Sequence, residues 1–100
     1  MSLDSPRSAS GETGVTVRYW ASARAAAGVS HDLIEVPGAL SLAELIDLAV
    51  ALHEESSGLR KVLHVCSVLV DDRPVGTRDP VDVLVEPGAS VEFLPPFAGG

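Results

Sequence analysis

The residues best suited to chemistry in this sequence are Gly99 and Gly100, which follow the pair Pro95-Pro96 and the apolar run 91–94. An α-carboxyl group has a pKa of about 3.3–3.7, so the terminus at Gly100 is an ionised carboxylate at neutral pH. An ionised carboxylate is a poor electrophile and must be activated before it can carry another group. Adenylation by ATP is one such activation, because it turns a carboxyl oxygen into a good leaving group. We expect the carboxylate of Gly100, with Gly99 beside it, to be the reactive group.

The residues before this carboxylate predict an extended tail. Pro95 and Pro96 have no N–H and favour polyproline geometry, so they end a strand and project the chain away from the body of the protein. Six residues at about 3.3 Å each reach roughly 20 Å. Because glycine has no Cβ, the last two residues can enter a channel too narrow for a side chain. The sequence therefore predicts a reactive tail over 95–100 that inserts into a partner.

Hydrophobic periodicity predicts the elements that hold this tail. They are, in order, a strand over 15–21, a helical turn over 22–27 closed by Gly28, a strand over 32–36, a helix from Ser41, an interior strand over 65–70, a short return strand from Val75, an apolar segment over 83–85 and a strand over 91–94. Ser41 and Glu44 form a capping box ahead of an apolar stripe, which makes this helix the clearest element. Gly58 is expected at the C′ position that stops it.

This order of elements predicts an α+β fold of the β-grasp type. We expect a mixed sheet of four to five strands packed on one main helix, with the first two strands in an antiparallel hairpin. The chain then divides into a disordered N-terminal extension over 1–14, a β-grasp domain over 15–94 and the reactive tail over 95–100.

Composition limits the possible partners. The net charge is −7, and the seven Lys and Arg residues are scattered, which disfavours nucleic acid. The most apolar stretch, 39–52, is interrupted by acidic residues and is shorter than the roughly 20 residues that cross a bilayer. With one cysteine and no apolar segment typical of a secretory signal near the start, we expect a cytoplasmic protein that binds neither nucleic acid nor membrane.

The cysteine and the histidines do not predict a site. Cys66 is expected in the middle of a strand among valines, where a free cysteine behaves as a small buried apolar residue. His31, His53 and His64 lack the spacing of metal ligands, so no metal is expected. No phosphate-binding loop or nucleotide fingerprint is present. We therefore expect no bound cofactor, and any ATP would be bound by an activating partner.

Strand alternation predicts a docking surface near the tail. If Val91 and Phe93 point into the core, Leu94 points outward, and Trp20 has the opposite parity to the buried Tyr19. An exposed apolar cluster of this kind suits a partner protein. Its expected members are Trp20, Val75, Leu94, Pro95, Pro96 and Phe97. The alternative is that one or two of them complete the core.

The order of elements, the Pro-Gly turn at 87–88 and the ending 93–100 resemble the ubiquitin-like sulfur carriers, and most closely the small subunit of molybdopterin synthase. The resemblance covers residues 15–100. It implies that a ubiquitin-activating-type adenylyltransferase adenylates Gly100 and that a sulfurtransferase converts it to a thiocarboxylate. The large subunit of molybdopterin synthase would then use this sulfur to form the dithiolene of the molybdenum cofactor. The chain would be a non-catalytic carrier, with the catalytic residues in the large subunit.

Three other functions are compatible with the same residues. The chain could carry sulfur for thiazole or cysteine biosynthesis. It could be a ubiquitin-like modifier whose Gly100 is conjugated to lysines of other proteins. It could also be a β-grasp interaction module whose two terminal glycines are inert.

Overall fold

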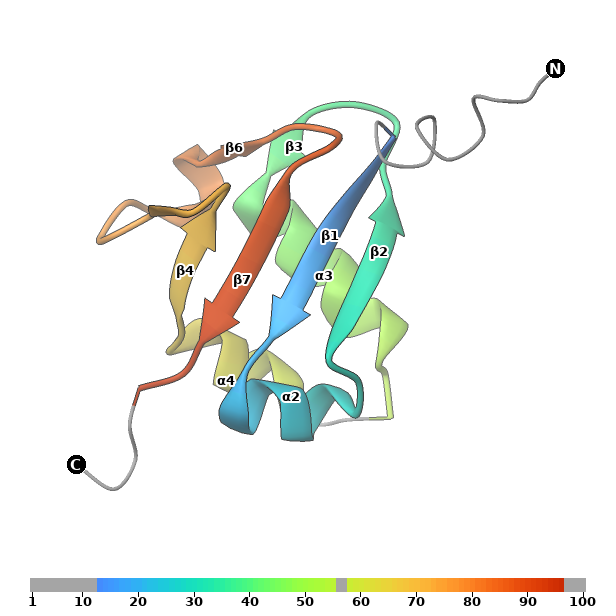
Figure 1. Ribbon diagram of the computed structural model, residues 1–100, viewed down its shortest axis with the longest axis vertical. Helices are drawn as coiled ribbons and strands as arrows, with labels where there is room; N and C mark the ends of the chain where they lie inside the picture. The colour runs from blue at the N-terminus through green and yellow to red at the C-terminus, as the bar shows by residue number, and fades with distance from the viewer. Residues whose placement is uncertain (1–12, 56–57, 97–100) are drawn as a thin grey trace, which may run out of the picture.

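The structure, a computed structural model, describes residues 13–55 and 58–96 (Figure 1). The predicted extension over 1–14 lies outside the described residues except for its last two positions. Phe97, Gly99 and Gly100 of the predicted tail also lie outside them.

A five-stranded mixed sheet forms one layer, and helices cover one of its faces (Figure 1). The sheet has the order β2-β1-β7-β4-β5, formed by β1 (Gly14–Tyr19), β2 (His31–Glu35), β4 (Ser67–Val70), β5 (Arg73–Pro74) and β7 (Ser90–Leu94). A second sheet pairs β3 (Leu40–Ser41) with β6 (Leu84–Val85), and the helical elements are α2 (Ala21–Ala27), α3 (Leu42–Leu52), α4 (Leu59–His64) and the 3-10 turn η1 (Pro80–Asp82). The predicted β-grasp fold is confirmed, with two shorter helices beside the main helix α3.

The last strand, β7, lies in the centre of the sheet. It runs parallel to β1, with Tyr19 opposite Phe93, and antiparallel to β4, with Val68 opposite Phe93. The predicted antiparallel hairpin of β1 and β2 is also present. The chain segment that leads into the tail is therefore held on both sides by backbone hydrogen bonds.

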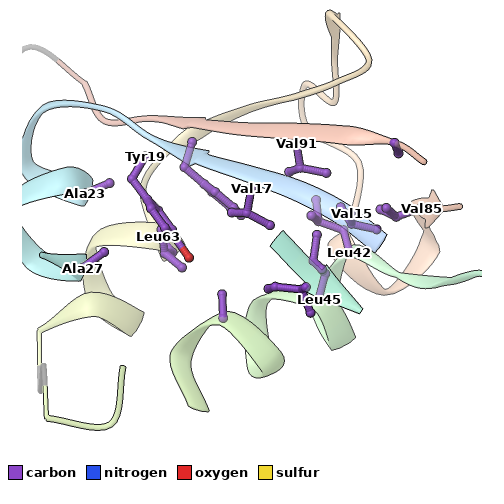
Figure 2. Close-up of a cluster of buried hydrophobic side chains, with 14 of the residues drawn as sticks. Val15, Val17, Tyr19, Ala23, Ala27, Leu42, Leu45, Leu63, Val85 and Val91 are labelled. Atoms are coloured by element: carbon purple, nitrogen blue, oxygen red, sulfur yellow. The ribbon is translucent and has the colours of Figure 1, made fainter. Parts of the chain in front are cut away.

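The core lies between the inner face of this sheet and the helices. Val15 and Val17 on β1 point toward Leu42 and Leu45 on α3 (Figure 2). Phe93 and Val91 of β7 are fully buried in the same cluster, as the strand alternation predicts. Because burial of such side chains stabilises a fold by about 1.5–3 kcal/mol each, this cluster anchors β7 strongly.

Hydrogen bonds at Ser41 confirm the predicted start of α3. The N–H of Glu44 donates to Ser41 Oγ at 3.0 Å, and the N–H of Ser41 donates to Glu44 Oε1 at 2.9 Å. The predicted stop at Gly58 is wrong, because α3 ends at Leu52 and Gly58 begins α4 with a right-handed φ of −94°. Gly28 does take the predicted role at the end of α2, with φ of 82°.

The predicted strand over 65–70 begins two residues late, at Ser67. The N–H of Val65 donates to the carbonyl of Val62, and that of Cys66 to Leu63, so both residues continue the turns of α4. Cys66 therefore does not lie within a strand, contrary to the prediction. Two residues with positive φ, at positions 71 and 72, then join β4 to β5, as type I′ hairpin turns require.

None of the helices in the described part of the chain has the length and apolar character of a bilayer-spanning segment.

Candidate functional site

The tail begins where β7 leaves the sheet (Figure 1). Leu94, the last residue of β7, pairs with Ser67 of β4. Pro95 is half-buried against the body of the protein and Pro96 is exposed. Because proline cannot donate a ladder hydrogen bond, the sheet stops at this point. The root of the tail is thus fixed in the fold, while its last four residues lie outside the described part of the chain.

Trp20 lies beside this root, on the outer face of the sheet. Its side chain is 42% exposed, in agreement with the predicted parity. The indole Nε1–H donates to Glu92 Oε1 at 3.0 Å, and the Arg18 Cζ lies 5.7 Å from the centroid of the indole ring. These two contacts hold an exposed aromatic side chain against β7, two residues before Leu94.

Leu69 completes the apolar part of this face. It lies on β4 opposite Glu92, and it is half-buried, as Leu94 is. Residues on neighbouring strands at diagonal positions are within reach of long side chains, so Leu69 and Leu94 flank Glu92 on one face. We call the surface formed by Trp20, Leu69, Leu94 and Pro95 the tail-root patch. Leu69 was not among the predicted members, because the apolar run 65–70 indicated an interior strand.

Val75 does not belong to this patch, contrary to the prediction. It is 6% exposed and forms part of the core. Its N–H donates at 2.9 Å to the carbonyl of Val68, whose side chain packs against the core. The strand β5 has two residues and ends before Val75. The alternation of inward and outward side chains along a strand therefore does not determine the orientation of Val75.

A half-buried cluster on the inner side of the sheet was not predicted. The hydroxyl of Tyr19 donates to Asp32 Oδ2 at 2.8 Å, and His53 Nε2 lies 2.6 Å from the same oxygen. Burial, and then the hydrogen bond to Asp32, raise the pKa of Tyr19 well above its usual range, so the phenol stays neutral. The ring of Tyr19 also stacks on Phe93, with centroids 6.3 Å apart. The cluster ties β1, β2 and the end of α3 together beneath the tail root.

The other histidines and the cysteine do not form a site in the described residues. No group of three or more His, Cys, Asp or Glu side chains there is arranged to hold a metal ion. Cys66 is half-buried, and its Sγ donates to the carbonyl of Val62 at 3.2 Å. Burial raises the pKa of this thiol to about 11, so it is protonated at neutral pH. A protonated, half-buried thiol is poorly suited to nucleophilic sulfur chemistry.

Comparison with known proteins identifies several relatives. Residues 17–100 match the model of the ThiS family. A Pyrococcus furiosus protein assigned as subunit 1 of molybdopterin converting factor is 25% identical, with TM-score 0.67 over 85% of this chain and 99% of its own. A chain in the Helicobacter pylori complex of subunits 1 and 2 of molybdopterin-converting factor is also 25% identical, with TM-score 0.56 over 87% of this chain and 99% of its own.

The small archaeal modifier protein 1 of Haloferax volcanii has the same fold. It is 15% identical, with TM-score 0.68 over 85% of this chain and 99% of its own. No curated protein matches this sequence.

Proposed function

Since this chain belongs to the ThiS family of ubiquitin-like sulfur carriers, we propose that it is the sulfur-carrier subunit of a molybdopterin synthase, with the sulfur held at Gly100. One observation carries the proposal: β7, the central strand, leads directly into the segment whose last residue, Gly100, also ends the family match. The 25% identity to the Pyrococcus furiosus protein favours the molybdopterin pathway over the thiazole and cysteine pathways.

The chemistry proceeds through the carboxyl group of Gly100. A carboxylate oxygen attacks the α-phosphorus of ATP, which forms an acyl adenylate and releases pyrophosphate. Hydrosulfide (HS⁻) delivered by the sulfurtransferase then attacks the carbonyl carbon and displaces AMP, and loss of the S–H proton leaves a thiocarboxylate. Transfer of this sulfur to the pterin precursor and hydrolysis by water restore the carboxylate. The activating enzyme binds the ATP, and the catalytic residues lie in the large subunit, so this chain binds no cofactor of its own.

The tail-root patch is the proposed docking surface for the large subunit, in the cytoplasm. Trp20, Leu69 and Leu94 offer apolar area beside the start of the tail, and Pro95 and Pro96 continue it. Phe97 and the two glycines, which lie beyond the described residues, then enter the partner. Apolar and aromatic side chains of this kind supply most of the binding energy at interfaces. The complex between subunits 1 and 2 in Helicobacter pylori supports a two-subunit arrangement.

Reconstitution tests the proposal. The full chain is mixed with a molybdopterin synthase large subunit, an activating enzyme, ATP, a sulfide source and the pterin precursor, and molybdopterin is measured. We expect molybdopterin with the full chain and none with a variant that lacks Gly99 and Gly100. Equal yields from the two chains would contradict the proposal. Thiazole or cysteine formation, or conjugates on lysines of other proteins, without molybdopterin would favour the alternative functions.

A further inference from the structure

A groove on the helical side of the molecule has no role in the proposed function. It lies between α3, α4 and η1, with a volume of about 700 Å³. Its floor is apolar, formed by Ala43 and Ile46 of α3, Val65 after α4 and Pro80 of η1. Val65 is 59% exposed, so a large apolar side chain faces solvent at one end. The helices cover the sheet face opposite the tail-root patch, so the groove and the patch lie on different sides (Figure 1).

The lining of this groove carries two cationic side chains, Arg60 and Lys61, although the whole chain has a net charge of −7. The groove is lined on the α4 side by three exposed residues, Arg60, Lys61 and His64. Asp47 is the one carboxylate among the described residues that line the groove, and it is paired with Arg60 at 2.9 Å. Both side chains of this ion pair are exposed to solvent, so their attraction is screened and weak. Lys61 makes no ion pair within the described residues.

We propose that this groove binds an acidic amphipathic helix of a partner protein. The apolar floor fits one face of a helix with leucine-like side chains at i, i+3, i+4 and i+7 spacing, which is a common mode of recognition in grooves. Carboxylates flanking that face would meet the cations Lys61 and Arg60, and the ring N–H of His64 can donate a hydrogen bond to one of them. The remaining surface of this acidic chain repels the same helix, so charge complementarity directs it to the groove.

The open shape favours a helix over a small molecule. Small-molecule sites enclose the ligand and point a few fixed polar groups at it. Here the groove is open, and the side chains of α4 that line it, Arg60, Lys61 and His64, are all exposed. Such an open lining suits a row of carboxylates along a helix.

The groove is connected to the tail root through β4. Val65 lines one end of it, and two residues later Ser67 pairs with Leu94 at the tail root. A helix in the groove would leave the outer sheet face uncovered. A second protein can therefore hold the carrier while the tail-root patch and the tail engage another one.

NMR titration of the isotopically labelled full chain tests this inference. The probe is a synthetic peptide of about 15 residues with leucine at i, i+3, i+4 and i+7 and glutamate on the flanking positions. We expect amide shifts at Ile46, Lys61 and Val65 and little change at Trp20 and Leu69. Lys61→Glu should weaken binding at least about tenfold, because it places a like charge against the peptide. A peptide with lysine in place of glutamate should not bind.

Arg73→Glu is the matched control, since it makes the same change of charge on β5, away from the groove. It should change the affinity less than about twofold if the groove itself recognises the peptide. Both variants should keep the melting temperature of the parent chain. Shifts confined to the outer sheet face, no shifts, or equal weakening by the two variants would overturn the inference. Shifts at the groove on raising the concentration of the chain alone would also overturn it, in favour of a second copy as the occupant. All of these readouts are independent of sulfur transfer.

Discussion

At the scale of single residues, Cys66 tests which group carries sulfur. Its thiol donates to the carbonyl of Val62, and burial raises its pKa from 9.0 to about 11. Because the reactive form is the thiolate, a rise of two units lowers its population about a hundredfold near pH 8. We expect alkylation by iodoacetamide to be at least that much slower than for a free thiol, with a rate that rises with pH toward a midpoint of about 11. A midpoint near 9 would place the thiol in solvent.

Cys66→Ser extends this prediction to function. The serine hydroxyl can make the same bond to Val62, so the fold should be kept. Sulfur loading of the chain should also be unchanged, since the thiol takes no part in it. Loss of loading with an intact fold would make Cys66 a sulfur carrier.

Leu94 tests the tail-root patch. Leu94→Asp should weaken binding of the large subunit at least about tenfold, because it puts a charge into the apolar centre of the proposed interface. Leu94 is only partly buried, so the melting temperature should fall by less than about 4 °C. The affinity is measured by calorimetry and the stability by thermal unfolding.

Leu84→Asp provides the control for this experiment. Leu84 is an exposed leucine of β6, in the second sheet. The substitution should leave the affinity unchanged. If Leu94→Asp unfolded the chain, Leu94 would be a core residue, and if both variants bound normally, the patch would not be the interface.

Single residues were predictable where one strand decided their orientation. The alternation along β7 correctly predicted that Val91 and Phe93 point into the core, and the predicted exposure of Trp20 was confirmed. The orientation of Val75 was wrongly predicted, because the turn at 71–72 and the end of β5 interrupt the alternation of inward and outward side chains before this residue. The bonds of Asp32 to Tyr19 and His53 join residues of three elements, and no local pattern in the sequence signals such contacts.

At the scale of elements, the start of α2 contains a strained residue. Ala21 has φ of 50°, a left-handed conformation that costs a residue with a Cβ about 1–2 kcal/mol. Ala21→Gly should therefore leave the free energy of unfolding unchanged or raise it by up to about 1 kcal/mol. Ala25→Gly, at an exposed position inside the same helix, should lower it by about 1 kcal/mol. Denaturant unfolding of both variants measures the difference, and equal losses would show that Ala21 is not strained.

Element boundaries were predictable where a local hydrogen bond sets them. The capping box at Ser41 and Glu44 involves four consecutive residues, so the sequence specified the start of α3. No local sequence pattern marks the end of α3, which stops at Leu52, well before Gly58. The next residue, His53, instead contacts Asp32 of β2, which is distant in the sequence. β4 starts later than predicted because Val65 and Cys66, at the start of the apolar run, donate hydrogen bonds back to Val62 and Leu63 of α4.

At the scale of the whole molecule, the sheet order explains how a small domain could support the proposed reactive tail. β1 and β4 hold β7 from both sides, and its inward side chains are fully buried. The tail thus starts from the best-anchored strand of the fold, beside the tail-root patch. The sequence predicted the fold class from the order of its elements. It did not reveal the groove, because α3, α4 and η1 form it only after they pack together.

The central claim is that the carboxyl group of Gly100 carries the sulfur. Its most direct test is the intact mass of the chain after incubation with its activating enzyme, ATP and a sulfur donor. We predict a gain of about 16 Da, the difference between oxygen and sulfur, located by fragmentation on the last residue. The chain without Gly99 and Gly100 should gain nothing. An unchanged mass for the full chain, or the same gain in the truncated one, would contradict the account.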